Sequence, residues 1–552
     1  MKFPEQSVSC GVHWRGRQEA TTRLAVKWWV LSPIMEEFME GFVRIQKIAL
    51  RLLCIASIAL IVPGSLSATK LFQPAQVYRS GGSTATSVAV ADLNHDGKPD
   101  LVVANVCVSP QNCDGGVGVL LGNGDGTFRT AKTYDTGNAF ASSVAVADVN
   151  GDGKPDIMVS NGGGCSPNPC IDKVAVLLGK GDGTFGVPQS YPSAYNTSAV
   201  AGADVNGDGK PDLLVTSVFA NPGLTGDGAL SVLLGNGDGS FGNAQSYDSG
   251  SGAAFAMAVG DLNGDGKLDA VIVHEQGVVG VLLGNGDGSF QAAQTYPSGG
   301  VLAYSIAIAD VNGDGKPDLL VTNSYCTDQG CPTPKSVVGV LLGNGNGTFE
   351  AALVYSTGAS LAQSVAVADV NGDGKLDLIV AHRSPNSISG SAVAVLLGKG
   401  DGTFQKSLRF YSGGQTALSI AVADVNQDGK PDLLVGNKCL SQTDCTTGGV
   451  GVLLGTAGVK TTTSLTSSLN PSTFGHAVTF TATIVSTGPH PPTGKVKFWD
   501  GTLGIGSATL SGGVATLTKS NLAVGTHAVT AQYLGDVDSG KSTSSVLNQV
   551  VQ

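Results

Sequence analysis

Hydrophobic and polar residues alternate in short runs through most of the chain after residue 70. In a representative unit, an alternating run at 143–148 is followed by apolar runs at 157–161 and 174–179. A Gly-Asp-Gly turn then leads into a segment at 184–191, which we expect to be a fourth strand. Alternation with a period of two and turn residues between the runs predict β-strands, and no sustained later stretch has helical periodicity. Each unit is therefore expected to form four short strands of alternating direction.

This unit occurs seven times, and each copy carries a nine-residue motif, D-x-N-x-D-G-x-x-D, between its first and second strands. The motif begins at Asp92, Asp148, Asp204, Asp261, Asp310, Asp369 and Asp424, in steps of 49 to 59 residues. Repeated units of four short strands are typical of propeller blades. We therefore expect an all-β chain with a seven-bladed β-propeller over residues 70–458. A linear β-solenoid is the alternative.

The two ends of this region complement each other. The last unit stops at 453–458 without a fourth strand, whereas a stray segment at 72–78 has the F-x-x-A-x-x-Y pattern that follows the turn elsewhere, as at 128–134. We expect the N-terminal segment to complete the last blade, because this closes the ring and leaves no open sheet edge. The complementary ends favour the propeller over the solenoid.

The nine-residue motif has the chemistry of a calcium loop. Asp at position 1, Asn at 3 and Asp at 5 and 9 supply hard oxygen atoms, Gly at 6 allows a sharp bend, and the carbonyl at 7 adds another oxygen; such all-oxygen sets suit Ca²⁺. The alternative is a row of Asx turns without metal. Three carboxylates within nine residues repel each other unless a cation lies among them, which favours the metal. We expect up to seven structural Ca²⁺ ions, held by Asp92, Asn94, Asp96, Lys98, Asp100, Asp148, Asn150, Asp152, Lys154, Asp156, Asp204, Asn206, Asp208, Lys210, Asp212, Asp261, Asn263, Asp265, Lys267, Asp269, Asp310, Asn312, Asp314, Lys316, Asp318, Asp369, Asn371, Asp373, Lys375, Asp377, Asp424, Asn426, Asp428, Lys430 and Asp432, with each Lys contributing its carbonyl.

Composition adds little to this picture. The formal net charge is −11, but three Asp in each of seven motifs account for 21 of the 43 acidic residues, so the acidity is local. There is no basic patch with interleaved aromatic residues, and no nucleic-acid partner is expected. At 552 residues the chain has room for more than one domain.

Residues 42–68 have the pattern of a secretory signal peptide. Basic residues precede an apolar core at 52–62, which is too short to span a bilayer as a helix, and a small-x-small cleavage site follows at 65–67. An uncleaved anchor is the alternative. Residues 1–41 do not fit such a signal and are interpreted as an over-extended reading frame or a disordered extension. The mature chain is expected to be secreted or at the cell surface, with no membrane span.

Eight cysteines form four close pairs, each in the loop between the second and third strands of its unit. Even numbers, loop positions and an exported chain favour local disulfides. A zinc site is the alternative, but each pair would need two further ligands, and none stands nearby. The predicted disulfides join Cys107 to Cys113, Cys165 to Cys170, Cys326 to Cys331, and Cys439 to Cys445.

The seven D-x-N-x-D-G-x-x-D motifs resemble the calcium loops of FG-GAP or VCBS repeats, which occur in the propeller of integrin α chains and in many bacterial secreted proteins. The resemblance covers residues 70–458 and implies a seven-bladed propeller with a calcium loop between the first two strands of each blade. The chain departs from the pattern in two ways. No Gly-Ala-Pro follows the second strand, and His95 and Gln427 replace the Gly found at motif position 4 in the other five copies. Position 4 is not a ligand position, so all seven sites are retained.

The C-terminal residues have a different pattern. After a linker at 459–463, residues 464–552 contain no acidic loop and no Cys, but they do contain alternating runs typical of a small β-sandwich. The segments at 495–501 and 533–536 resemble bacterial Ig-like repeat domains, which implies a spacer or adhesion module. Its expected strands include 477–484, 494–499 and 526–533.

The loops divide between two faces. The calcium loops and Gly-Asp-Gly turns are nearly uniform, whereas the loops and connectors at the opposite strand ends vary in length and sequence, which favours recognition on the varied face. A polar residue recurs thirteen positions after each leading Asp; it either caps strand-end backbone or belongs to a ring around a ligand. This candidate ligand ring comprises Asn105, Asn161, Ser217, His274, Asn323, His382 and Asn437.

Aromatic residues on the varied face either stack on sugars or pack the loops. They are Phe140, Tyr195, Phe219, Phe255, Tyr304 and Tyr325. We expect a secreted calcium-binding propeller that binds extracellular glycan or protein ligands as an adhesion module. The alternative is a carbohydrate-active enzyme, because some propellers of this repeat type resemble polysaccharide lyases and sugar dehydratases. No catalytic residue is predicted.

Overall fold

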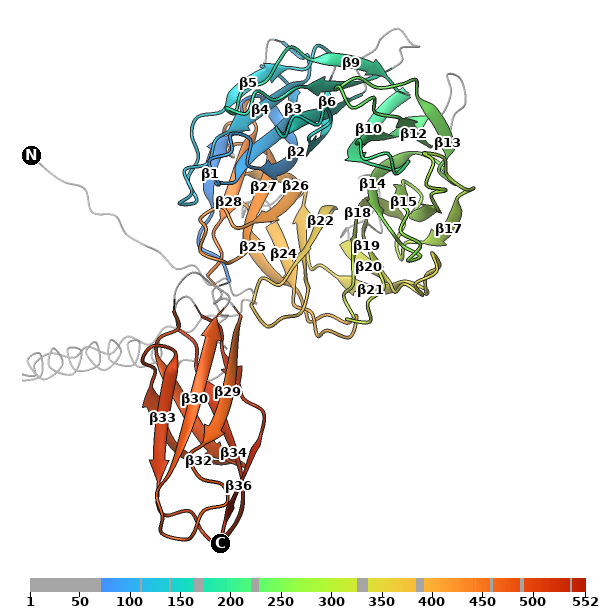
Figure 1. The fold of residues 1–552 in the computed structure, drawn as a ribbon. Coiled ribbons are helices and arrows are strands. Elements are labelled where there is room, and N and C mark those ends of the chain that lie inside the picture. Colours follow the sequence, from blue (N-terminus) through green and yellow to red (C-terminus); the bar gives the residue numbers. More distant parts are fainter. Residues whose placement is uncertain are drawn as a thin grey trace, which may run out of the picture. The chain divides into compact units, whose positions relative to one another are not determined.

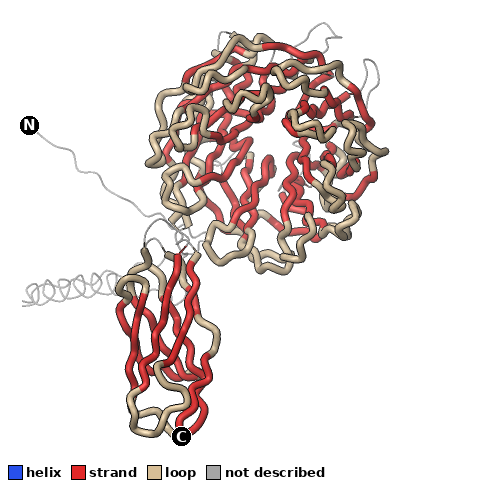
Figure 2. Tube along the Cα trace, in the orientation of Figure 1, coloured by secondary structure: helices blue, strands red, loops and turns tan. Residues whose placement is uncertain are grey.

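The computed structural model describes residues 71–109, 112–138, 140–162, 172–193, 195–219, 228–324, 336–383, 392–441, 443–456, 460–486, 491–536 and 539–552. These residues form strands, turns and loops, with no helix among them (Figure 2). The all-β prediction is therefore confirmed. Within these ranges no helix is long or apolar enough to cross a bilayer. The predicted signal peptide at 42–68 lies outside the described residues.

Seven four-stranded antiparallel sheets correspond to the seven predicted units, and we number them in the order of their nine-residue motifs. Their strands are, for sheet 1, β2 (Ser83–Ala91), β3 (Asp100–Cys107), β4 (Gly116–Leu120) and β5 (Lys132–Asp135); for sheet 2, β6 (Ala141–Ala147), β7 (Asp156–Asn161), β8 (Lys173–Leu177) and β9 (Gln189–Pro192); for sheet 3, β10 (Tyr195–Ala203), β11 (Asp212–Phe219), β12 (Ala229–Leu233) and β13 (Gln245–Asp248); for sheet 4, β14 (Ala254–Gly260), β15 (Asp269–His274), β16 (Val278–Leu282) and β17 (Gln294–Pro297); for sheet 5, β18 (Leu302–Ala309), β19 (Asp318–Ser324), β20 (Ser336–Leu341) and β21 (Leu353–Ser356); for sheet 6, β22 (Ala362–Ala368), β23 (Asp377–His382), β24 (Ala392–Leu396) and β25 (Leu408–Tyr411); for sheet 7, β26 (Gln415–Ala423), β27 (Asp432–Cys439), β28 (Gly449–Leu453) and β1 (Gln76–Arg79).

The sheets form a closed ring with the first strand of each sheet nearest the centre (Figure 1). Each first strand contacts the first strand of the next sheet, and β26 of sheet 7 returns to contact β2 of sheet 1. Apolar residues fill the layers between successive sheets; Val102 of sheet 1 and Ile157 of sheet 2, both fully buried, belong to one such cluster. Burial of apolar surface between sheets is the main source of stability in this arrangement.

The ring closes as the sequence predicts. The N-terminal strand β1 pairs antiparallel with β28, from Gln76 opposite Val452 to Arg79 opposite Gly449. Ahead of β1, Phe72 forms an isolated bridge with Gly455. The two ends of the propeller thus build one sheet together, and sheet 7 has the same four-strand order as the other six.

Edge-to-face aromatic pairs join every sheet to the next. In sheets 1 to 6, the Phe after the Gly-Asp-Gly or Gly-Asn-Gly turn meets the Tyr on the last strand of the preceding sheet, with ring centroids 5.2–5.6 Å apart. At the closure Phe72 takes the place of the missing turn Phe and packs on Phe410 of sheet 6. Such pairs contribute about 0.5–1.5 kcal/mol each beyond area burial. The aromatic residues of the F-x-x-A-x-x-Y pattern therefore connect the sheets.

The fourth strand differs from the prediction. We expected it to run from 184 to 191, but β9 covers only Gln189–Pro192, and Phe185 makes an isolated bridge to Gly179. The first strands also contain a feature that alternation does not predict, a β-bulge near the start of each, for example between Ala85 and Ser87. A bulge adds one residue to one strand and redirects its side chain.

The C-terminal residues form two packed antiparallel sheets, as predicted for an Ig-like sandwich. One contains β29 (Thr461–Ser467), β30 (Val478–Ser486) and β33 (Val514–Lys519), and the other contains β31 (Lys495–Asp500), β32 (Leu503–Thr509), β34 (Gly525–Tyr533), β35 (Ser542–Thr543) and β36 (Leu547–Val551). Phe480, Phe498 and Tyr533, each with 0% exposure, lie in the core between them.

Candidate metal loops and the opposite face

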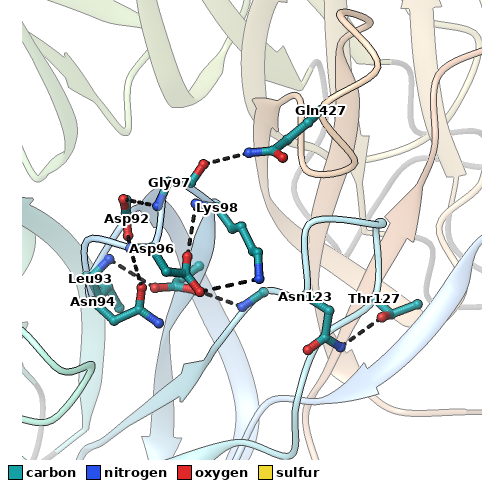
Figure 3. A network of polar contacts seen from close by, with 11 residues as sticks. Asp92, Leu93, Asn94, Asp96, Gly97, Lys98, Asn123, Thr127 and Gln427 are labelled. Atoms are coloured by element: carbon teal, nitrogen blue, oxygen red, sulfur yellow. Dashed lines mark hydrogen bonds and ion pairs between the residues drawn. The ribbon is translucent and has the colours of Figure 1, made fainter.

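Each nine-residue motif folds into a compact loop whose own oxygens accept backbone hydrogen bonds. Figure 3 shows the motif of sheet 1. In sheet 1, Asp92 accepts bonds from the N–H groups of Asp96 (3.1 Å) and Gly97 (2.8 Å), and Asp96 accepts one from Lys98 (3.0 Å). Asn94 also accepts a bond from Asp96 N–H at 3.0 Å. These short-range bonds are the Asx-type turns expected for such residues, and they bring the side chains of positions 1, 3 and 5 together.

The Asp at position 9 has a different environment from the others. In sheet 1, Asp100 is fully buried and joins two turns, accepting bonds from Leu93 N–H at 3.0 Å and from Gly122 N–H at 2.7 Å. All seven position-9 carboxylates are buried and make this double bond, so each one ties its motif to the turn between the third and fourth strands. From the sequence we predicted only metal binding for this residue. In the structure it also links the motif to the turn between the third and fourth strands.

Burial raises the pKa of all seven position-9 carboxyl groups above their usual value. The two backbone N–H bonds lower the pKa in part, and the negative charges at positions 1 and 5 raise it further. For Asp377 and Asp432 the pKa rises to about 7. Burial is the largest cause of the raised pKa in all seven.

The loop chemistry fits a hard divalent cation, although the loops are not pre-assembled as all-carboxylate sites. Within the described ranges, no group of three or more His, Cys, Asp or Glu side chains is placed to hold a metal. Asn at position 3 and the carbonyl at position 7 would have to complete the set. Because each carboxylate oxygen has two lone pairs, the backbone bonds of Asp100 leave acceptor capacity for a metal. A cation would also relieve the repulsion that raises the position-9 pKa.

In six of the loops the Lys at position 7 lies beside the Asp at position 5. The Nζ–Oδ2 distances are 2.9–3.8 Å. Five of these Lys side chains are 36–46% exposed, so the pairs are surface contacts that contribute little to stability.

The loops are also bonded from sheet to sheet. The last Gly of the turn in one sheet donates its N–H to the position-2 carbonyl of the preceding sheet's motif, as from Gly183 to Leu93 at 3.3 Å. The same bond crosses the ring closure, from Gly126 of sheet 1 to Val425 of sheet 7. This bond is found at five of the seven junctions between sheets, which supports a structural role for the motifs.

Position 4 has a left-handed backbone conformation in all seven motifs. Five copies have Gly there, whereas the two motifs at the ring closure have His95, with φ of 57°, and Gln427, with φ of 58°. The Gln427 side chain crosses the closure and donates Nε2–H to the carbonyl of Gly97 at 2.6 Å (Figure 3). The substitutions were visible in the sequence, but this partner, 330 residues away, was not.

The candidate ligand ring is not on the surface. All seven residues are buried, with exposures of 0–2%, so they are not available to a ligand and the ring hypothesis is wrong. Six of them bond instead to a buried Ser or Thr hydroxyl just after the outer strand, at 2.5–2.9 Å, for example Asn105 to Ser80. Asn105 also donates to the Ser80 carbonyl at 3.1 Å. The alternative interpretation, that these residues cap backbone groups at the strand ends, agrees with the bonds of Asn105 to the carbonyls of Ser80 and Val103, although that backbone is buried. The recurring Tyr/Phe-x-Ser/Thr-Gly at the end of the outer strand was the sequence signal for the partner.

His274 shows how closely such a site constrains its side chain. Its Nε2 lies 2.9 Å from Ser249 Oγ and its Nδ1 lies 3.3 Å from the carbonyl of Val278. Burial lowers the pKa of His274, and the neutral ring with the proton on Nδ1 satisfies both contacts. The imidazole is thus an internal structural group.

Two of the four predicted disulfides are present, Cys107–Cys113 and Cys439–Cys445. Both close the loop after the second strand, in sheets 1 and 7 on either side of the ring closure. The other two predicted disulfides are not confirmed, because their cysteines lie outside the described residues. The bond between Cys165 and Cys170 in sheet 2 therefore stays a prediction. The bond between Cys326 and Cys331 in sheet 5 stays a prediction for the same reason.

Phe255 and Tyr304 are the predicted surface aromatics that meet. Their rings are stacked, with centroids 5.9 Å apart and planes at 6°. Tyr325 and the side chains of Tyr195 and Phe219 lie outside the described residues.

The repeats are matched by family models. The model described as FG-GAP-like repeat matches residues 105–159, 165–215, 218–272, 261–321, 331–380 and 385–435. The chain belongs to the FG-GAP-like repeat family. A further model, FG-GAP repeat, matches residues 84–105 in sheet 1, so the FG-GAP matches together include all seven nine-residue motifs.

The C-terminal sandwich is matched separately. The model described as Bacterial Ig-like domain (group 3) covers residues 465–552. The chain therefore combines an FG-GAP propeller with a bacterial Ig-like domain, as both resemblances implied.

Proposed function

We propose that this FG-GAP protein is a secreted, calcium-stabilised binding or adhesion module for an extracellular glycan or protein at or near a bacterial cell surface. The single observation that supports this most is the asymmetry of the two faces. The motif face repeats the same bonds in every sheet, whereas the loops between second and third strands range from three residues (275–277) to eleven (162–172 and 325–335). A uniform face serves as scaffold, and a varied face serves recognition.

Two further observations support the extracellular setting. The described disulfides are of the kind that persist in oxidising compartments. The second module is a bacterial Ig-like domain, a type that suits a spacer or adhesion role.

In this proposal, positions 1, 3, 5, 7 and 9 of each motif would hold Ca²⁺. When bound, the ion would neutralise the carboxylates of the loop. The protein's own residues bend the chain at Gly, orient the carboxylates through backbone N–H groups and tie the motif to the neighbouring turn. Recognition then depends on residues at the opposite strand ends.

A binding screen tests the proposal. The full chain, loaded with calcium, would be tested against a panel of glycans and extracellular matrix proteins, with product analysis on each glycan. Stoichiometric binding without product supports the module. Release of unsaturated sugar products would instead support the lyase alternative.

A further inference from the structure

The Ig-like sandwich contains a His–Asp pair at one end of its core. His527 is the third residue of β34, and Asp500 is the last residue of β31, which pairs with β34. Each lies two residues from a fully buried residue of its own strand, Val529 for His527 and Phe498 for Asp500, so both side chains leave their strands on the core-facing side. The side chains are only 15% and 22% exposed. The pair is therefore partly enclosed where the core ends.

Both ring nitrogens of His527 face oxygen atoms. Nδ1 lies 2.5 Å from Asp500 Oδ2, and Nε2 lies 2.8 Å from the carbonyl oxygen of Ala523. A carbonyl and an ionised carboxylate can only accept hydrogen bonds, so each ring nitrogen has to donate one and the imidazole has to carry both protons. A protonated carboxyl that donates to Nδ1 is the less favourable form, because imidazole is the stronger base. The geometry therefore requires a charged His527.

His274 in the propeller provides the comparison. Its Nε2 faces the hydroxyl of Ser249, which can donate as well as accept, and its Nδ1 faces the carbonyl of Val278. A neutral ring therefore satisfies both contacts of His274. The two contacts of His527 found within the described ranges are both acceptors, so a neutral ring leaves one of its bonds unmade.

Asp500 is the charged group that faces His527. The strands β29, β35 and β36, which contact β34, contain no charged residue, and neither do the turn after β31 and the loop before β34. β31 also carries two Lys residues, but they lie toward its other end, the nearer being Lys497. In the facing sheet β33 ends at Lys519, for which no ion pair is found among the residues that the structure describes. Protonation of His527 is therefore governed mainly by its own two hydrogen bonds.

We propose that the His527–Asp500 pair is a proton-dependent clasp that makes the Ig-like domain more stable in mildly acidic than in alkaline surroundings. With both ring protons present, the clasp joins the end of β31 to the loop before β34. Once the Nδ1 proton leaves, a lone pair faces the carboxylate and that bond is lost. The clasp does not depend on what the propeller binds, so it goes beyond the binding function proposed above.

The direction of the pH dependence follows from these bonds. Hydrogen bonds to the Ala523 carbonyl and to Asp500 raise the pKa of His527, while burial opposes them. In the unfolded chain a His has a pKa of about 6.5. Because the folded pKa is the higher one, the stabilisation is complete below about pH 6.5 and is lost as the pH rises through the folded pKa.

An NMR titration of the full chain carrying isotope-labelled histidine tests the clasp, because ring-nitrogen shifts distinguish a doubly protonated imidazole from both neutral tautomers. The His527 signal, identified by its absence in His527→Gln, should keep both ring protons to a higher pH than the signal of His476, an exposed His of the same domain. Asp500→Asn is the matched variant, since its amide can donate to an unprotonated Nδ1 and preserve the bond. In that variant His527 should lose its second proton at a pH lower by about one unit or more.

The same signal measures the stability of the sandwich alone, because its folded form disappears when the sandwich melts. Between about pH 6 and about pH 9, the melting temperature of wild type should fall by about 4–8 °C more than that of Asp500→Asn, the shift expected for one pKa unit of linkage in a small domain. His476→Gln is the control and should behave as wild type. Two results would overturn the clasp: His527 and His476 losing their protons at the same pH, or equal pH dependence of melting in wild type and Asp500→Asn. If Asp500→Asn does not fold, the wild-type titration decides alone.

Discussion

The hydrogen bond across the ring closure offers a sharp test of the structure, because the chain contains its own control. Gln427→Gly removes the bond to Gly97 and relieves the left-handed backbone at position 4. His95→Gly relieves the same backbone conformation in the neighbouring motif, where no side-chain hydrogen bond of His95 is found within the described ranges.

The two substitutions should differ by the free energy of the hydrogen bond. Relief of a left-handed non-Gly residue gains about 1–2 kcal/mol, and the extra freedom of Gly in the unfolded chain costs about 0.5–1 kcal/mol. His95→Gly should therefore be neutral or slightly stabilising. An exposed hydrogen bond contributes about 0.5–1 kcal/mol, at the low end of the usual range. Gln427→Gly should be less stable than His95→Gly by about that amount, with the loss confined to the closure.

Hydrogen exchange of peptides covering β1 and β28 measures this local effect. In the Gln427→Gly variant, exchange there should be faster than in the His95→Gly variant by roughly two- to fivefold, the equivalent of about 0.5–1 kcal/mol. Peptides from sheets 3 and 4 should be unchanged. Equal exchange of β1 in the two Gly variants would refute the view that Gln427 holds the ring closed.

Other parts of the structure give further expectations. His274→Ala should lower the free energy of unfolding, measured in urea, by about 3 kcal/mol, because it removes two buried contacts and leaves Ser249 unpaired. His274→Asn introduces the Asn–Ser pair found in sheets 1, 5 and 7 and should cost less than about 1 kcal/mol. Equal losses in the two variants would contradict the pairing. Phe72→Ala should destabilise by about 3–5 kcal/mol and speed hydrogen exchange at β1, whereas Phe241→Ala in the uninterrupted sheet 3 should leave β1 protected. In EDTA, the melting temperature should rise as the pH falls from about 7 toward 5. Asp377 and Asp432, with pKa values raised to about 7, bind protons in the folded chain that the unfolded chain does not bind. The lowered pKa of His274 opposes this trend, but His274 is one group against two. In calcium the carboxylates stay ionised and this trend should disappear; an identical pH profile in EDTA and calcium would count against metal binding.

Much of the fold follows from local sequence. Alternation and turn chemistry predicted the strands, and the stray segment at 72–78 predicted the closure, because a missing strand and a spare strand with the same pattern must pair. The predicted start of the fourth strand was wrong. Phe185 fits the strand pattern, but its ring packs against Tyr134 of the preceding sheet. The bulges could not be predicted, because the alternation of apolar and polar residues does not reveal an extra residue in a strand.

The candidate sites were harder to predict for the same reason. A polar residue at a strand end has the same pattern whether it faces solvent or a buried partner, so Asn105 gave no sign that Ser80 would enclose it. Phe255 and Tyr304 were marked as surface aromatics, but their stacking depends on equivalent bulges in neighbouring sheets. Such relations between repeats are set by the ring, which local patterns do not encode.

The central claim is that the seven motifs are calcium sites that stabilise the ring. Its most direct test is to measure bound calcium per chain by elemental analysis, together with melting in calcium and in EDTA. The account predicts several bound ions, up to seven, and a propeller transition that moves to higher temperature with calcium, while Asp92→Asn combined with Asp96→Asn removes one ion. A chain that binds no calcium and melts at the same temperature in EDTA would contradict it.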